Sequence, residues 1–137
     1  MSSVSRQLIF PAAAGLTAII LGAFGAHGLE SRGLATESVH AWETAVEYQF
    51  YHVFALIAIA MLHKHLAQGP AKWARRMMIA GMLMFSVSIY GLVLDELAGM
   101  SWSFLGPITP LGGTLLTIGW GCFLAASVKG NKADSVS

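Results

Sequence analysis

Five residues with ionisable or phenolic side chains lie in or beside long apolar stretches of this sequence: His27, Glu43, Glu47, Tyr48 and His52. If those stretches cross a membrane, each such side chain is a candidate for function, because an ionisable group at bilayer depth is costly. Residues four apart share a face of a helix, so Glu43 and Glu47 lie on one face and Tyr48 and His52 lie on another. We expect His27 to lie at a depth similar to that of Glu47, where the two side chains could pair.

These residues are compatible with three kinds of chemistry. The interpretation we favour is structural, with the polar groups forming hydrogen bonds between the first two helices. The alternative is a site for a proton, a metal ion or a small polar molecule, since histidine and carboxylate suit transition metals. A haem held by His27 and His52 is disfavoured, because these residues differ in depth by about 10 Å and both axial ligands must reach one iron. We expect no cofactor, and the identity of any metal stays open.

The elements that position these residues are four apolar runs. A helix needs about 20 apolar residues to cross a bilayer, and the runs cover residues 8–29, 46–62, 77–94 and 107–128. The composition agrees, because 55% of the residues are hydrophobic and 11% are charged, against about 25% charged in soluble domains. The sequence predicts an all-α, four-helix transmembrane bundle that forms a single integral-membrane domain over residues 1–137.

The charges between the runs sort by sign, and this sorting predicts the orientation. The basic residues before the first run, between the second and third, and after the fourth are Arg6, Lys64, Lys72, Arg75, Arg76, Lys129 and Lys132. The acidic residues in the other two connections, or at the edge of the second run in the case of Glu47, are Glu30, Glu37, Glu43, Glu47, Asp95 and Glu96. The exceptions to the sorting are Arg32 and Asp134. By the positive-inside rule we expect both termini in the cytoplasm and the chain in the plasma (inner) membrane.

Small residues at four-residue spacing indicate where helices pack, because close backbone approach drives helix association in lipid. The first run carries the stripe Ala14, Ala18, Gly22 and Ala26, and the fourth carries the stripe Gly113, Thr117, Gly121 and Ala125. We expect these stripes to be packing seams, and contact between them is one arrangement they allow. Gly25 and Gly112 are further candidates for helix packing. The tryptophans near the ends of the runs are typical of aromatic belts at headgroup depth: Trp42, Trp73, Trp102 and Trp120. For Trp120, burial against a neighbouring helix is the alternative.

Three stretches carry a resemblance to a known family: residues 21–29 (LGAFGAHGL), residues 43–52 (ETAVEYQFYH), and residues 108–113 (ITPLGG) with Gly119 and Trp120. Together they resemble the YgdD-like, transmembrane protein 256-like family of small inner-membrane proteins. The resemblance covers nearly the whole chain and implies four membrane spans. Because that family is a domain of unknown function, it implies no catalytic or binding role. The matching residues are Gly22, Gly25, His27, Gly28, Tyr48, His52, Pro110, Gly112 and Gly113.

The function that we expect is that of a non-enzymatic membrane protein with an accessory or structural role. The alternative is a small transporter or an ion-binding or metal-binding protein, with a site among His27, Glu43, Glu47, Tyr48 and His52 near the outer face. No nucleophile–base arrangement, phosphate-binding glycine loop or basic nucleic-acid patch is present in the sequence. The expected partners are the lipid bilayer and either another membrane protein or further copies of the chain, with no nucleic acid.

Overall fold

The computed structural model describes residues 2–130, and over this range it is helical with no strand. Lys132 and Asp134, which entered the charge pattern, lie outside the described residues. Four helices in the range are long and apolar enough to cross a membrane: Ser3–Leu29, Thr36–Met61, Gln68–Ala98 and Ser103–Lys129. The predicted fold class, a four-helix transmembrane bundle, is therefore confirmed.

Two of these helices change from α to π geometry along their length. Helix α1 (Ser3–Phe24) continues as the π-helical turn η1 (Gly25–Leu29) and the short turn η2 (Glu30–Arg32), and α2 spans Thr36–Met61. Helix α3 (Gln68–Met82), the π-helical turn η3 (Leu83–Val87) and α4 (Ser88–Ala98) form one rod, after which η4 (Ser103–Leu105) leads into α5 (Ile108–Lys129). Gly99 ends α4 in the left-handed conformation, with φ of 65°, which glycine adopts without steric cost.

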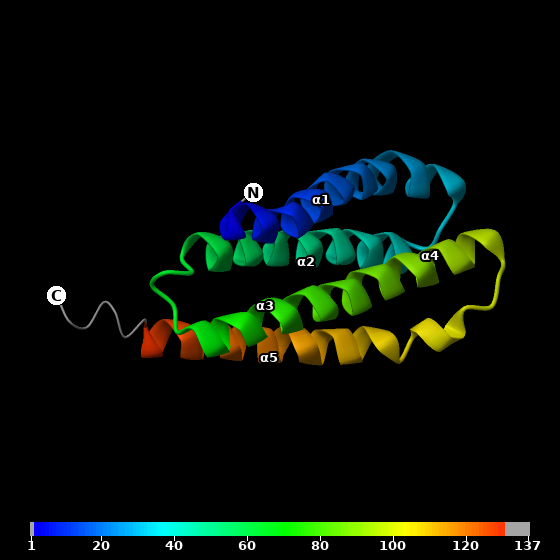
Figure 1. The fold of residues 1–137 in the computed structure, drawn as a ribbon. Coiled ribbons are helices and arrows are strands. Elements are labelled where there is room, and N and C mark those ends of the chain that lie inside the picture. The colour runs from blue at the N-terminus through cyan, green and yellow to red at the C-terminus, as the bar shows by residue number, and fades with distance from the viewer. Residues whose placement is uncertain (1, 131–137) are drawn as a thin grey trace.

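The bundle has a basic end and an acidic end. Figure 1 shows the start of α1, the α2–α3 connection and the end of α5 at one end, and the α1–α2 and α4–α5 connections at the other. At the first end, the Ala67 amide donates to the Ala126 carbonyl over 3.1 Å; at the second, the Ser38 hydroxyl donates to Glu96. We call the first the basic end (Arg6, Lys64, Lys72, Arg75, Arg76, Lys129) and the second the acidic end (Glu37, Glu43, Glu47, Asp95, Glu96).

The helices pack in two pairs, and this arrangement corrects one expectation. Helix α1 packs chiefly on α2, whereas α5 packs chiefly on α3 and η3 (Figure 1). The two small-residue stripes on α1 and α5 therefore do not face each other. On α1, Ala14 and Ala18 are buried, and Gly22 contacts Val46 of α2. A stripe on α1 can pack only against the helix beside it, and that helix is α2.

Helix α5 approaches the α3–η3 segment at backbone distance, and glycines make this approach possible. A Cβ atom on Gly81 would lie 2.8 Å from the Leu116 nitrogen, and one on Gly112 would lie 2.4 Å from the Phe85 nitrogen. Gly119 faces Met78 in the same way, at 2.8 Å from its Cγ. Gly112 and Gly119 thus line the face of α5 that packs. Gly113 and Gly121 lie on a neighbouring face, and a Cβ on Gly121 would meet nothing within 4 Å.

Two of the four tryptophans form hydrogen bonds to a neighbouring helix. Trp42 is 1% exposed and lies between α1 and α2, where its Nε1 donates to the Leu21 carbonyl over 2.8 Å. Trp120 lies midway along α5 and donates to His52. An indole N–H is costly to bury unpaired, so both side chains take an acceptor on another helix. Trp73 and Trp102 lie near helix ends and are exposed.

Candidate functional site

The five polar residues singled out from the sequence lie in three places. Tyr48 and His52 face α5 and line a cavity of about 690 Å³ between α2 and α5. Glu43 and Glu47 line a smaller cavity, of about 360 Å³, between α2 and α1. His27 is exposed, on the π-helical turn η1. A π-helical turn changes which face each later residue occupies, and it separates His27 from the α2 residues that helical spacing had grouped with it.

His52 is the most constrained of the five, because both ring nitrogens have a partner. Its side chain is 3% exposed. Nδ1 lies 2.6 Å from the Tyr48 carbonyl oxygen, and Nε2 lies 3.1 Å from Nε1 of Trp120. A carbonyl can only accept and an indole N–H can only donate, so Nδ1 carries the proton and Nε2 accepts. His52 is therefore a neutral imidazole that ties α2 to α5.

The cavity beside His52 has a mixed lining. Aromatic rings of Tyr48, Tyr51 and Trp120 form its rim, and Tyr48 stacks on Phe85 with 4.7 Å between ring centroids. Thr114 and Thr117 also line it, but their hydroxyls donate to the Pro110 and Gly113 carbonyls, four residues earlier on α5. Backbone acceptors thus engage both threonine hydroxyls of the lining, and much of the remaining surface is aromatic.

The carboxylates at the acidic end do not form a cluster with His27. The nearest ionic contact joins Nδ1 of His40 to a Glu43 carboxylate oxygen, 3.5 Å apart and exposed. The predicted pairing of His27 with Glu47 is not formed among residues 2–130. In the same part of the chain no three His, Cys, Asp or Glu side chains come close enough to hold a metal ion together. A pair that reaches the same depth still cannot meet when its members lie on different helix faces.

A buried polar network that sequence reasoning missed lies at the centre of the bundle. The Gln49 amide nitrogen donates to the Ala14 carbonyl (2.7 Å) and to the Thr17 hydroxyl (3.0 Å), and its oxygen accepts from the Tyr90 hydroxyl (2.8 Å). One amide thereby joins α1, α2 and α4. The sequence carried a signal for it, since Gln49 is the one amide side chain in the predicted run 46–62, and such a group needs partners in lipid.

A second tie that the sequence did not reveal joins η3 to α2. The Ser86 hydroxyl donates to the Ala45 carbonyl over 2.8 Å, and the side chain is 1% exposed. A single serine in an apolar run is too common to be noticed, because its hydroxyl can always bond to its own helix. Here it bonds across to α2 instead, at the place where η3 departs from α geometry.

Comparison with known proteins gives one family. Residues 21–113 match the model of the family described as "Protein of unknown function (DUF423)". The UPF0382 membrane protein YwdK of Bacillus subtilis is 39% identical over 123 residues, which cover 89% of this chain and 95% of that protein. The UPF0382 membrane protein C1782.12c of Schizosaccharomyces pombe is 36% identical over 110 residues, covering 80% and 91%.

A relative from Haemophilus influenzae, also named a UPF0382 membrane protein, is 37% identical over 119 residues, which cover 85% of this chain and 88% of the relative. These relatives match over nearly their whole length, so the similarity extends through all four helices rather than one motif. No solved structure matches the chain.

Proposed function

Since the chain belongs to the DUF423 family of UPF0382 membrane proteins, a multi-pass family whose function is unknown, we propose that it is a non-enzymatic membrane protein with an accessory or structural role in a larger assembly. One observation carries this proposal: both ring nitrogens of His52 are engaged, Nδ1 by the Tyr48 carbonyl of its own helix and Nε2 by Trp120 of α5. A histidine used in this way holds two helices together and has no lone pair left for a metal ion or a travelling proton.

The same reasoning weakens the transporter alternative. A transport site needs polar groups that converge on one cavity at bilayer depth. In this chain His52 is engaged, Glu43 and Glu47 are exposed on another face, and His27 lies on η1. The five residues are better explained as one hydrogen bond between helices, from Trp120 to His52 with the Tyr48 carbonyl holding the imidazole in place, and a set of exposed polar groups at the acidic end.

Partners are proposed from the surface that the bundle leaves open. The stripe Gly113, Thr117, Gly121 and Ala125 is not covered by α3, and the cavity between α2 and α5 lies beside it. Small residues let another transmembrane helix approach closely. We therefore propose that this face of α5 packs on a membrane-protein partner or on a further copy of the chain, within a lipid bilayer.

We further propose that both termini are cytoplasmic, in a plasma (inner) membrane, and that the chain falls in the YgdD-like branch of its family. The gathering of six basic side chains at one end supports the orientation. A cysteine introduced at Gln68, in a Cys122→Ser background, should resist membrane-impermeant thiol reagents in intact cells. Labelling without permeabilisation would reverse the orientation, and a family tree that separates the chain from YgdD-like proteins would contradict the branch.

The experiment that tests the proposed function combines stability with transport for His52→Leu, Trp120→Phe and the double variant. Each single change removes the same hydrogen bond, so the losses should not add, with a coupling of about 0.6 to 1.7 kcal/mol. Stability is measured by thermal unfolding in mild detergent. In proteoliposomes, the wild type and His52→Leu should leak H⁺, K⁺ and Zn²⁺ no faster than protein-free vesicles. Flux through the wild type that His52→Leu abolishes would assign the site to a transporter instead.

A further inference from the structure

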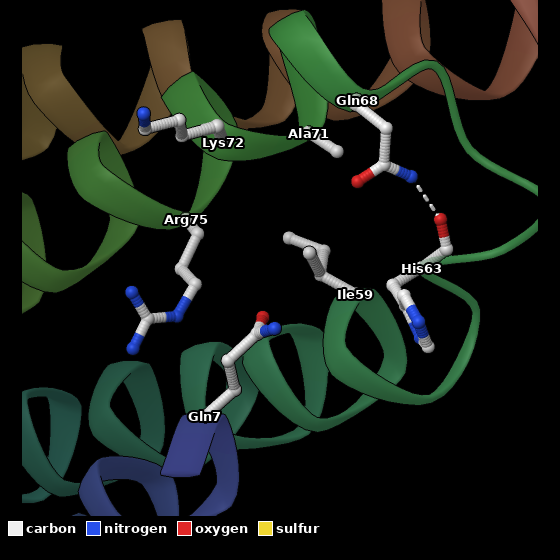
Figure 2. Close-up of a pocket in the computed structure, with 7 residues that line it drawn as sticks. All are labelled: Gln7, Ile59, His63, Gln68, Ala71, Lys72 and Arg75. Atoms are coloured by element: carbon white, nitrogen blue, oxygen red, sulfur yellow. Dashed lines mark hydrogen bonds between the residues drawn. The ribbon is translucent and has the colours of Figure 1, made fainter. Parts of the chain in front are cut away.

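A second cavity, unrelated to His52, lies at the basic end between the start of α1, the end of α2 and the start of α3. It has a volume of about 370 Å³ and is lined by Gln7, Ile59, His63, Gln68, Ala71, Lys72 and Arg75. Figure 2 shows Lys72 and Arg75 on one side of the open space, Gln68 and His63 on the other, and Gln7 and Ile59 between them. Three separate elements therefore contribute polar groups to one hollow.

The lysine and arginine side chains that line this cavity have no acidic side chain beside them in the lining. Its lining contains Lys72 and Arg75 and no carboxylate, and the acidic residues among residues 2–130 all belong to the α1–α2 connection, the first turns of α2 or the end of α4. Neither Lys72 nor Arg75 forms an ion pair within the described part of the chain. Two cations without a counterion beside a hollow make a site for an anion, because arginine and lysine bind phosphate well.

The amides that line the cavity have different roles. The Gln68 amide nitrogen is engaged, because it donates to the His63 and Leu66 carbonyls in the connection between α2 and α3. The Gln7 side chain has no hydrogen-bond partner among residues 2–130, so its N–H groups are available to an incoming acceptor. Gln68 shapes the hollow, whereas Gln7, Lys72 and Arg75 supply the donors.

A separate, apolar cavity lies further along the same helices. It has a volume of about 360 Å³, and its lining includes Phe10, Ala13, Met82, Leu83 and Val87. Phe10 lies three residues after Gln7 on α1, and Met82 lies seven residues after Arg75 on the α3–η3 rod. These spacings keep each pair on one helix face. The polar hollow and the apolar groove are therefore successive segments of one seam between α1 and the α3–η3 rod, running from the basic end toward mid-bundle.

We propose that this seam binds an anionic phospholipid. The phosphate group lies in the basic cavity against Arg75, Lys72 and Gln7, and an acyl chain lies in the apolar groove past Phe10 and Leu83. Charge complementarity selects an anionic headgroup over a zwitterionic one. The apolar groove selects a lipid over a soluble phosphate compound, since a small anion would leave that surface uncovered.

The test is lipid binding to purified protein in mild detergent, followed by native mass spectrometry and by the rise in unfolding temperature. Three probes with matched chains or headgroups are phosphatidylglycerol, phosphatidylcholine with the same acyl chains, and glycerol 3-phosphate. Phosphatidylglycerol should bind the wild type at least tenfold more tightly than either other probe. Equal binding of phosphatidylcholine, or equal binding of glycerol 3-phosphate, would overturn the proposal, in the second case in favour of a soluble anion.

Matched variants separate the seam from the general charge of the basic end. Arg75→Gln and Lys72→Gln should each weaken phosphatidylglycerol binding about tenfold. Arg76→Gln is the control, because Arg76 lies outside the cavity, 5.7 Å from the Trp73 ring centroid, and should change the affinity less than twofold. If Arg76→Gln weakened binding as much as Arg75→Gln, a diffuse surface charge would explain the result and the site would be refuted.

The apolar half is tested on α1. Ala13→Phe fills the groove and should weaken phosphatidylglycerol binding several-fold, whereas Ala12→Phe, on an exposed position of α1 outside the groove, should leave it unchanged. Both substitutions add the same ring to the same helix, and each variant is first required to elute and unfold like the wild type without added lipid. Equal affinities for the two variants would remove the acyl chain from the proposal.

Discussion

The two helix pairs of this bundle are held together by different means. Helix α5 lies against the α3–η3 rod at backbone distance, with glycines at Gly81, Gly112 and Gly119. Helix α1 lies against α2 through side chains that reach its backbone: Trp42 bonds to the Leu21 carbonyl and Gln49 to the Ala14 carbonyl. The first pair depends on the absence of side chains, and the second depends on the presence of polar ones.

The difference shows what a polar residue at bilayer depth does in this chain. Lipid tails do not drive apolar helices together, so helices associate by close packing or by hydrogen bonds between them. Gln49, Ser86 and His52 all supply such hydrogen bonds. A polar side chain is costly to place in lipid, and such a residue therefore suggests a functional site. In this bundle these side chains instead hold α2 to its three neighbours.

The largest expected effect of a single substitution is at Gly112. In Gly112→Ala the new Cβ would lie 2.4 Å from the Phe85 nitrogen and 2.8 Å from the Phe85 Cα. Backbone atoms cannot move aside as a flexible side chain can, so the helices must separate. We expect a loss of about 3 kcal/mol, the upper end of the usual cost of overpacking, measured by thermal unfolding in mild detergent.

The adjacent residue provides the control for this prediction. In Gly113→Ala the nearest atom to the new Cβ would be Cδ2 of Phe85 at 3.9 Å, an ordinary contact. We expect a change within about 0.5 kcal/mol, as for substitutions away from packed groups. Equal losses at Gly112 and Gly113 would mean that both faces of α5 pack equally closely, and the contrast between the two helix pairs would fail.

The other pair is tested at Gln49. Gln49→Leu keeps the volume and removes three hydrogen bonds, to Ala14, Thr17 and Tyr90, and it leaves the Tyr90 hydroxyl without that partner. We expect a loss of about 2 kcal/mol, measured in the same way. Tyr90→Phe removes only one of the three bonds and should cost about 0.6 kcal/mol, the average for such bonds in membranes. A smaller loss for Gln49→Leu than for Tyr90→Phe would remove Gln49 from the centre of the network.

The contrast between the pairs also marks what the sequence could predict. Length and hydropathy predicted four spans, because a bilayer fixes how long an apolar helix must be. They could not predict which face of α5 packs. Gly112 and Gly113 are neighbours about 100° apart around the helix axis. An apolar helix face can lie against lipid or against protein, so hydropathy does not distinguish the face that packs from the face that is exposed to lipid. The four-residue spacing of small residues favoured Gly113 and Gly121. The close contact lies instead at Gly112, which the sequence offered only as a further candidate, and at Gly119, which it did not single out for packing.

The candidate site was predictable only in part, for a related reason. The sequence identified His52 and Trp120 separately, but they are 68 residues apart, and no local pattern relates residues on α2 to residues on α5. The grouping of His27 with Glu47 relied on depth alone. The depth of a residue in the membrane follows from its position along the helix. Contact between two residues also depends on which way each helix is turned about its axis, and the π-helical turns η1 and η3 change that angle.

The smallest expected effect on stability is at Gly121, and it extends the comparison to a third surface, the open face of α5. A Cβ at Gly121 would meet nothing within 4 Å, so Gly121→Leu should change the unfolding free energy by less than about 0.5 kcal/mol.

If this face packs on another helix, as proposed, the leucine would hold the two backbones apart and weaken association. Energy transfer between differently labelled copies in liposomes measures self-association. Ala23→Leu, which enlarges an exposed small residue of α1 instead, should leave that transfer unchanged. If Gly121→Leu and Ala23→Leu reduced the energy transfer of the wild type equally, the copies would associate without using this face of α5. Destabilisation of the single chain by Gly121→Leu would show that the face is already covered within one bundle.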